Sequence, residues 1–323
     1  MKKIKVAFIY HKDNIFLSGN HFDNTYYHFY INALKRNETL DVTYVPTGDI
    51  FDASELKDKF DIILLWENSE FGMPNELVGL DELNLPVITK VSDPFRASKS
   101  IKLHKKWKID HYFWMCHEDF FYELYPRKFK YKTIIFGLEP SLYQNVKPFN
   151  ERIKNKILLT GSIGNTKFFS RMINDIRRPK WNAYRFYYLR TLCSKLPYVS
   201  YSPTFSHKYV NDMYPKLLEQ YSASITASSY SPNIKYLENT AAGCLTFMEI
   251  TKKNRGDYFG YKDEETAIFI DENNHREKFN EFLSDPDNPK WERIAKAGRE
   301  FALKNLNNDK AVSSLVELMG SMT

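Results

Sequence analysis

In two stretches of the chain, glycine, hydroxyl and charged residues occur where an expected strand runs into an expected helix. In the first, the apolar run 156–160 leads into Gly161, Ser162 and Gly164, and a helix is expected just beyond. Glycines let backbone N–H groups approach a ligand closely, and a helix N-terminus favours an anion. Arg171, one turn into that helix, is placed to pair with a diphosphate. A tight strand–helix turn with a capped helix explains the same residues equally well.

The second stretch follows the expected strand 223–226. Its loop, 227–234, holds serines, a proline and Tyr230, and a helix is expected to begin at Lys235. A carboxylate one turn into such a helix can accept two hydrogen bonds from a ribose diol, and Glu238 has that place. Lys235 shares its helix face and has the charge to neutralise a phosphate. A weak Lys–Glu pair on the surface is the alternative, and spacing alone favours it.

Three candidate acid–base groups follow expected strands in the first half of the chain. His21 lies in the loop after the first strand, Asp93 after the fourth and His117 after the fifth. A histidine or an aspartate can take the proton from a substrate hydroxyl. Ordinary loop and cap roles also explain them, because Asp93 precedes a proline and His117 precedes two acidic residues at an expected helix start.

Short apolar runs alternate with longer helical patterns along the whole chain. Strands are expected at 5–10, 40–45, 61–66, 86–91, 111–115, 132–136, 156–160, 223–226, 245–249 and 267–270. Helices are expected at 24–36, 56–59, 99–106, 118–125, 167–176, 184–196, 210–219, 235–242, 275–284 and 289–305. Continuous apolar strands alternating with helices predict parallel sheets covered on both faces, with ligands at the carboxyl ends of the strands.

The pattern is interrupted near 137–154, and the chain of 323 residues suits two domains. We therefore expect an α/β protein of two Rossmann-like domains facing each other across a cleft. In this expectation residues 1–145 form an N-terminal domain and residues 146–323 a C-terminal domain. The last segment, 309–319, is a candidate helix that crosses back to the first domain.

Composition limits the classes of protein. The hydrophobic fraction of 43% predicts a folded core, and the net charge of +6 favours an anionic partner only weakly. The three cysteines, Cys116, Cys193 and Cys244, lie far apart, which argues against disulfides and a zinc site and favours a cytoplasmic location. No apolar stretch reaches the roughly 20 residues of a membrane span, although peripheral membrane contact remains open.

Several segments resemble GT-B glycosyltransferases of the group 1 type, above all the spore-maturation-protein-like branch. The run from Lys235 to Phe247 is similar to the donor-site helix and the strand after it. The segment 258–271 resembles the one that follows in the family, 294–299 resembles an "I-A-x-A-G-R" helix, and 136–143 resembles the element that closes the first domain. These elements occur in the family's order.

The resemblance implies a metal-independent transferase with a nucleotide sugar, UDP- or GDP-linked, as its substrate and no other cofactor. It also implies that residues 1–145 form the acceptor domain and residues 146–323 the donor domain. By position, Glu238 would hold the donor ribose, Lys235 and Arg171 would contact the diphosphate, and the turn from Gly161 to Gly164 would approach it. Many retaining members carry a glutamate eight positions before the second one, where this chain has Tyr230. The role of that glutamate is therefore unassigned, and Tyr230 is kept as a donor-site candidate.

Other functions stay open at this point. The acceptor would be a glycan, a protein or a lipid-linked molecule. An epimerase of GT-B fold would use the same donor without an acceptor. Basic and aromatic residues in 122–132 and 177–190 also allow a nucleic-acid or nucleotide-sugar binding module without catalysis, although neither stretch forms a recognised nucleic-acid motif.

Overall fold

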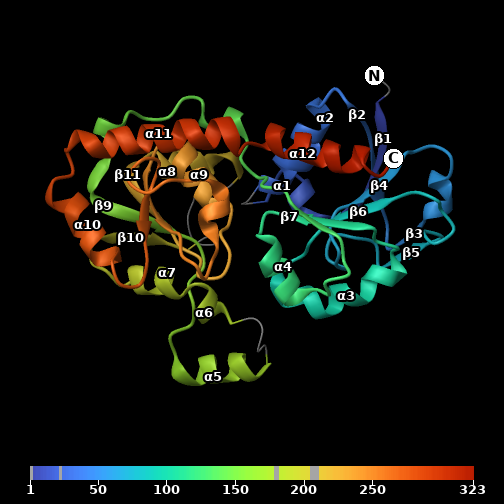
Figure 1. The fold of residues 1–323 in the computed structure, drawn as a ribbon, viewed down its shortest axis with the longest axis horizontal. Helices are drawn as coiled ribbons and strands as arrows, with labels where there is room; N and C mark the ends of the chain where they lie inside the picture. The colour runs from blue at the N-terminus through green and yellow to red at the C-terminus, as the bar shows by residue number, and fades with distance from the viewer. Residues whose placement is uncertain (1–2, 22–23, 178–181, 204–210) are drawn as a thin grey trace. The chain divides into compact units, whose positions relative to one another are not determined.

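The computed structural model describes residues 3–21, 24–177, 182–203 and 211–323. These residues form two compact units (Figure 1). Unit 1 comprises residues 1–136 and 308–323, and unit 2 comprises residues 137–307. The boundary expected from the sequence, between residues 145 and 146, lies nine residues after the observed one between residues 136 and 137.

Unit 1 is built on a six-stranded parallel sheet in the order β2-β1-β4-β6-β7-β8. Its strands are β1 Ile4–His11, β2 Leu40–Thr47, β4 Ile62–Leu65, β6 Val87–Lys90, β7 His111–Trp114 and β8 Tyr131–Thr133. Every residue of β4 and β6 is buried, because helices and loops cover both faces of the central strands. All six strands expected from the apolar runs are therefore confirmed.

The helices of unit 1 differ more from expectation than its strands do. The expected helix 24–36 is one helical segment made of α1 Thr25–Tyr27, a π-helical stretch His28–Ala33 and α2 Leu34–Arg36. The helices α3 Ala97–Lys106 and α4 Glu118–Leu124 form as expected. The helix expected at 56–59 is wrong, because a 3₁₀ turn, Ala53–Leu56, ends there. A small second sheet of β3 Ile50–Asp52 and β5 Glu76–Val78 was not expected.

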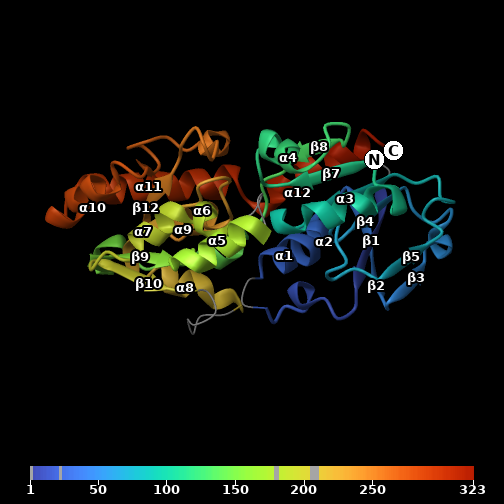
Figure 2. The same cartoon turned by 90° about the horizontal axis from the view of Figure 1, so that it is seen from below.

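The last helix, α12 Asn308–Gly320, belongs to unit 1 although unit 2 precedes it in the sequence. Asp309 accepts a hydrogen bond from the Arg36 guanidinium at 2.7 Å, and the Ser314 carbonyl accepts one from the Lys132 ammonium at 3.1 Å. Figures 1 and 2 both show α12, in red, beside the segment that contains α1 and α2.

Unit 2 holds a five-stranded parallel sheet in the order β10-β9-β11-β12-β13. Its strands are β9 Ile153–Thr160, β10 Val199–Ser202, β11 Tyr221–Thr226, β12 Leu245–Glu249 and β13 Ile268–Ile270. Its helices are α5 Phe168–Arg177, α6 Ala183–Phe186, α7 Tyr188–Cys193, α8 Tyr214–Leu218, α9 Lys235–Ala241, α10 His275–Ser284 and α11 Pro289–Asn305. Edge strand β10 was not expected, because its residues alternate between apolar and hydroxyl side chains over only four positions.

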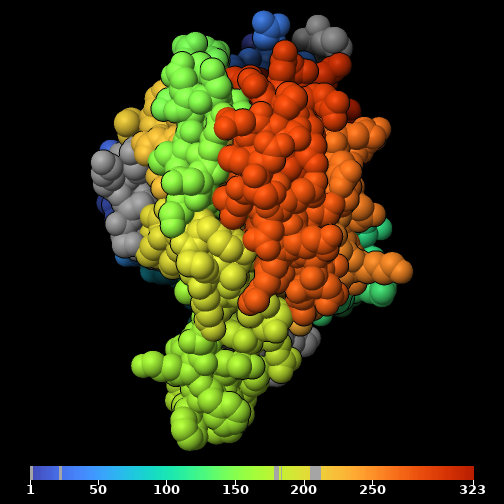
Figure 3. Space-filling model, turned by 90° about the vertical axis from the view of Figure 1, so that its left-hand side faces the viewer, coloured from blue at the N-terminus to red at the C-terminus, as the bar shows by residue number. Residues whose placement is uncertain are grey.

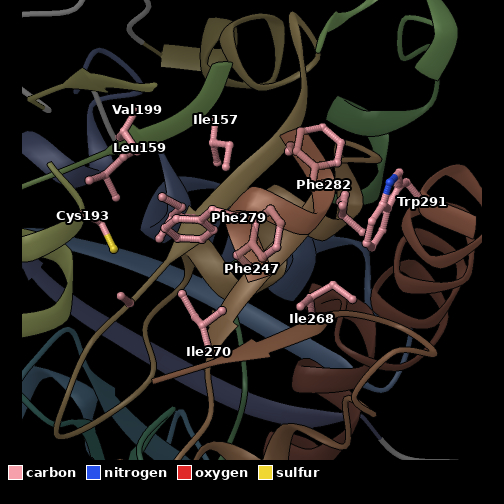
Figure 4. Packing of buried hydrophobic residues seen from close by; sticks show 14 of the residues in the cluster. Ile157, Leu159, Cys193, Val199, Phe247, Ile268, Ile270, Phe279, Phe282 and Trp291 are labelled. Atoms are coloured by element: carbon pink, nitrogen blue, oxygen red, sulfur yellow. The ribbon is translucent and has the colours of Figure 1, made fainter. Parts of the chain in front are cut away.

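The core of unit 2 lies between this sheet and helices α7, α10 and α11 (Figure 4). The rings of Phe247 on β12 and Phe279 on α10 meet edge to face, with centroids 4.8 Å apart. Trp291 of α11 packs against Phe282 in the same way at 5.8 Å. This core fixes the strands whose carboxyl ends carry the candidate site.

Helix α5 is the exception to this packing. None of its residues is buried. Figure 3 shows the yellow-green segment around α5 and α6 standing out from the rest of unit 2. Within the described ranges, no helix has the length and apolar character needed to cross a membrane.

Candidate functional site

The turn after β9 needs glycine at its first position. Gly161 has a φ of 102°, in the region that side chains with a Cβ rarely adopt. Its N–H donates to the Ser202 carbonyl at 3.2 Å, and its own carbonyl accepts from the Tyr201 hydroxyl at 2.9 Å. The turn is thus tied to edge strand β10, and the Gly161 amide has a partner within the protein.

Gly164 has a different reason to be glycine. A Cβ at this position would lie 2.3 Å from the Cα of Tyr184, so only glycine allows α6 to approach so closely. The Gly164 N–H donates to the Thr191 hydroxyl of α7 at 2.9 Å. Close packing against α6 and α7 therefore accounts for this glycine without a ligand.

A chain of hydrogen bonds links the end of β9 to the start of α9. The hydroxyls of Thr160 and Tyr214 lie 2.6 Å apart, and the Lys235 ammonium donates to the Tyr214 hydroxyl at 3.1 Å. The ammonium also lies 4.6 Å from the centre of the Tyr214 ring, within the range of a cation–π contact. Lys235 is therefore held at the carboxyl edge of the sheet by a neutral partner.

Lys235 carries a positive charge at neutral pH. Burial lowers its pKa, but Tyr214 and Glu238 raise it by more, so that its pKa lies above the ordinary value. Glu238 lies one turn further along α9, and both side chains are partly exposed. The two residues that spacing singled out are thus electrostatically coupled and keep access to solvent.

Arg190 on α7 joins the two loops of this edge. It is 3% exposed, and its guanidinium donates twice to the Ala227 carbonyl, at 2.6 and 3.0 Å, and once to the Ser162 carbonyl at 3.0 Å. Ser162 follows β9 and Ala227 follows β11. Arg190 therefore ties the loop after β9 to the loop after β11 and places a second cation near Lys235, whose pKa it lowers.

The first amides of α9 already have partners. Asn233 accepts from the N–H of Lys235 through its side chain at 3.0 Å and from the N–H of Tyr236 through its carbonyl at 3.0 Å. The next two N–H groups both donate to the Ile234 carbonyl. Charge for an anion at this edge would therefore come from the side chains of Lys235 and Arg190 rather than from open amides of the helix.

The other donor candidates lie around this centre or apart from it. Tyr230, in the loop between β11 and α9, stacks on Phe186 at 5.0 Å and carries the Lys253 ammonium over its ring at 4.6 Å. Ser162 is exposed in the glycine turn. Arg171 lies on α5, and its guanidinium stacks over the ring of Tyr184 on α6 at 3.8 Å. Figure 1 shows α5 apart from α8 and α9. The structure therefore does not bring Arg171 together with Lys235.

Glu249 ends β12 and is 3% exposed. Burial raises its pKa to about 7, although Ser229, Arg190 and Lys253 act in the opposite direction. Its Oε2 atom is buried without a hydrogen-bond partner among the described residues. Neither Glu249 nor Lys90, the last residue of β6, was predicted from the sequence as a site residue. The available signal was the same for both, namely a charged residue that closes an otherwise apolar strand.

In unit 1, a buried ion pair lies at the carboxyl ends of β4 and β6. The Lys90 ammonium donates to Glu67 Oε2 at 2.7 Å and to the Val91 carbonyl at 3.2 Å. The second carboxylate oxygen of Glu67 accepts from the Ser69 hydroxyl. Lys90 and Glu67 are 2% and 6% exposed, so both charges are satisfied inside the protein.

Aromatic rings surround this ion pair. The Lys90 ammonium lies 4.7 Å from the centre of the Tyr26 ring and 5.0 Å from that of Trp66. Phe16 contacts both of these rings, and it also contacts the candidate His21, whose ring centre is 4.3 Å away. His21 is therefore part of an aromatic cluster at the carboxyl edge of the sheet.

Asp93 lies within electrostatic range of the same ion pair. The surrounding chain desolvates its carboxyl and raises its pKa, although the residue as a whole is exposed; Lys90 opposes this shift and Glu67 adds to it. Asp93 precedes the 3₁₀ turn Pro94–Arg96, and its side chain does not cap that turn. The structure thus brings Asp93 and His21 to one end of the sheet.

His117 has a structural role at the start of α4 Glu118–Leu124. It is the N-cap of α4, where its Nδ1 atom accepts a hydrogen bond from the Asp119 N–H at 3.2 Å. Part of its hydrogen-bonding capacity is therefore used to start this helix.

Metal ligation has little support in the described part of the chain. No group of three or more His, Cys, Asp or Glu side chains there is arranged to hold a metal ion.

The fold matches solved structures over nearly the full chain. The Anabaena protein HepE, solved with UDP-glucose, has a TM-score of 0.60 at 11% identity, with 98% of this chain and 100% of that chain covered. Sucrose-phosphate synthase from Thermosynechococcus elongatus has a TM-score of 0.59 at 12% identity, with 99% of each chain covered.

An alpha-glucosyltransferase solved with UDP-glucose and DNA containing an abasic site has a TM-score of 0.57 at 12% identity, with 98% of this chain and 100% of that chain covered. These three solved structures are GT-B glycosyltransferases. The α/β fold with parallel sheets is therefore of the GT-B type, as the sequence predicted.

No protein-family model matches the chain, and no curated protein matches it either. The resemblance to the spore-maturation-protein-like branch therefore stays a prediction.

Proposed function

We propose that this protein is a glycosyltransferase that moves a hexosyl group from a UDP-sugar to an acceptor hydroxyl without a metal ion. The observation that carries the proposal is the placement of Lys235 and Glu238 at the carboxyl edge of the second sheet, on a fold shared with glycosyltransferases solved with UDP-glucose. In parallel sheets ligands bind at this edge.

Each residue has a role in this proposal. Glu238 accepts two hydrogen bonds from the ribose diol. Lys235, oriented by Tyr214, neutralises the diphosphate, while Arg190 adds positive charge and keeps the loops with Ser162 in place.

Gly161 sets the path of the first loop, and Gly164 brings α6 close to it. Tyr230 would reach the sugar or the base with its hydroxyl, because its ring already stacks on Phe186 and carries the Lys253 ammonium.

During the reaction the bond between the anomeric carbon and the UDP oxygen breaks, and a bond to the acceptor oxygen forms. Negative charge grows on the leaving diphosphate, so a fixed ammonium lowers the barrier. The acceptor hydroxyl must lose its proton. We propose Asp93 for this step ahead of His21 and His117, because its raised pKa makes it a stronger proton acceptor and its side chain caps no turn.

The acceptor is proposed to be a glycan, a protein or a lipid-linked molecule. DNA is a less favoured acceptor; one of the similar structures was solved with DNA. We propose that the reaction takes place in the cytoplasm, because the three cysteines lie far apart and are all free.

The test compares thermal shifts with UDP-glucose, GDP-mannose and the free nucleotides. UDP and its sugar should raise the melting temperature of the wild-type protein, and Glu238→Ala should lose this shift. Glu300→Ala, an exposed glutamate on α11, is the matched control and should keep it. An unchanged shift in Glu238→Ala would remove the ribose assignment, and the absence of a shift with every nucleotide would remove the proposed function. Slow release of UDP that persists in EDTA would support metal-independent transfer.

A further inference from the structure

Helix α5 presents a continuous apolar surface to solvent. Its large apolar side chains expose 44–74% of their area: Phe168, Phe169, Met172, Ile173 and Ile176. At about 100° per residue these positions fall within about 140° around the helix axis. Polar and charged residues occupy the rest of the circumference, so α5 is amphipathic with its apolar face uncovered.

The rest of unit 2 does not cover this face. No residue of α5 is buried, and the segment stands out from the body of the unit (Figures 1 and 3). The contacts that hold α5 come from its polar side. Asp175 forms an ion pair with Arg185 of α6 at 3.3 Å and accepts from Asn182, and Arg171 stacks on Tyr184. The protein thus fixes the polar side of the helix and leaves the apolar side outward.

Positive charge borders the apolar face. Lys167, Arg171 and Arg177 lie on α5 or directly before it, and the one carboxylate of the helix, Asp175, is neutralised by Arg185. Arg178, Lys180 and Trp181 follow in the sequence. Basic residues beside an apolar face rich in phenylalanine are typical of helices that lie in the headgroup region of an anionic bilayer.

We propose that α5 is an interfacial helix that binds unit 2 to a membrane surface containing anionic lipid. A second protein fits less well. A helix of ten residues is about 15 Å long, and its apolar face alone falls short of the roughly 800 Å² that each partner contributes to a stable protein interface. Nucleic acid also fits less well, because phosphate contacts need polar side chains where this face has phenylalanine and isoleucine. The inference does not depend on the proposed function.

The test is flotation of the full chain with vesicles of phosphatidylcholine alone or mixed with phosphatidylglycerol. The wild-type protein should float with the mixed vesicles and stay behind with the neutral ones. Phe168→Ser/Phe169→Ser should reduce the bound fraction at least about tenfold, since two aromatic side chains leave the interface. Lys167→Glu/Arg177→Glu should weaken binding and remove its dependence on salt concentration.

Ile50→Ser is the matched control, because Ile50 is 68% exposed on β3 of unit 1. It should bind like the wild type, and all variants should keep their melting temperature, since the substituted side chains are exposed. Wild-type protein that fails to float, or a double serine variant that floats equally well, would overturn the inference. So would sedimentation showing a wild-type dimer that the serine substitutions dissociate, or salt-sensitive DNA binding that they abolish.

Discussion

Each of the two large sheets has a buried glutamate at its carboxyl edge, and the two glutamates are treated in opposite ways. Glu67 of unit 1 is hydrogen-bonded to Lys90, whereas Glu249 of unit 2 has an Oε2 atom without a partner in the described structure. The lysines differ in the same sense, because Lys90 binds a carboxylate and Lys235 binds the hydroxyl of Tyr214. Unit 1 thus neutralises its buried lysine with a carboxylate, whereas the lysine of unit 2 is hydrogen-bonded to a neutral hydroxyl and stays partly exposed beside Glu238.

The difference indicates what each edge can bind. Above the neutralised pair of unit 1, Trp66 is fully buried, and the partly exposed rings of Tyr26 and Phe16 that pack on it suit an uncharged acceptor such as a sugar. Around Lys235, unit 2 offers Arg190 and a glutamate one turn along the helix, which suit a diphosphate and its ribose.

Removing Lys90 should have the largest effect. Lys90→Ala leaves the Glu67 carboxylate buried and unpaired, so we expect the free energy of unfolding to fall by about 3–5 kcal/mol in urea titrations. Lys90→Met combined with Glu67→Leu should recover most of this loss, because neither charge is then buried alone. If Lys90→Ala unfolds like the wild type, Lys90 does not neutralise Glu67 inside the folded protein, and the contrast with Glu249 fails.

The raised pKa of Glu249 predicts that its contribution to the free energy of unfolding changes by about 3 kcal/mol with pH. The folded protein keeps this carboxyl protonated up to a pKa of about 7, whereas the unfolded chain releases the proton above its ordinary pKa of 4.5. The stability contributed by this group is therefore greatest at low pH and is lost as pH rises from about 4.5 to 7.

Glu249→Gln should remove this pH dependence of stability. In thermal melts at pH 8 the variant should have a higher melting temperature than the wild type. Glu292→Gln, an exposed glutamate of α11, should leave the slope unchanged. Parallel pH profiles for Glu249→Gln and the wild type would show that Glu249 is charged in the folded protein.

Lys235→Ala should weaken UDP binding by about 10- to 100-fold, the effect of losing a charge-assisted hydrogen bond of about 1.5–3 kcal/mol. Isothermal titration with UDP and with uridine separates the causes, since only UDP carries the diphosphate and uridine binding should change little. Equal losses for both ligands would contradict a phosphate role for Lys235.

His117 should give the smallest effect. His117→Ala removes the N-cap of α4 and should lower the free energy of unfolding by about 1 kcal/mol, whereas His117→Asn restores a capping acceptor and most of the stability. Steady-state rates of UDP release then distinguish the roles. Rates that survive in His117→Asn identify a capping residue, and rates lost in both variants identify a proton acceptor.

The sequence predicted the central strands well, because runs such as 6–9 and 62–65 are apolar throughout and are buried on both faces. It also singled out Lys235 and Glu238, whose spacing along one helix is local information. Tyr214 and Arg190 were not predicted as site residues, because the segments that they connect come together only in the folded sheet. Periodicity predicted α5 as a helix but not its exposure, since an amphipathic pattern does not say what covers the apolar face.

The place of α12 has a consequence for the order in which the protein folds. Domains generally fold as units while the chain emerges from the ribosome, the N-terminal one first. Here the ion pair between Arg36 and Asp309 cannot form until all of unit 2 has been synthesised. The surface of unit 1 around α2 thus stays uncovered while unit 2 acquires its core, and the first half of the protein is the last to be completed.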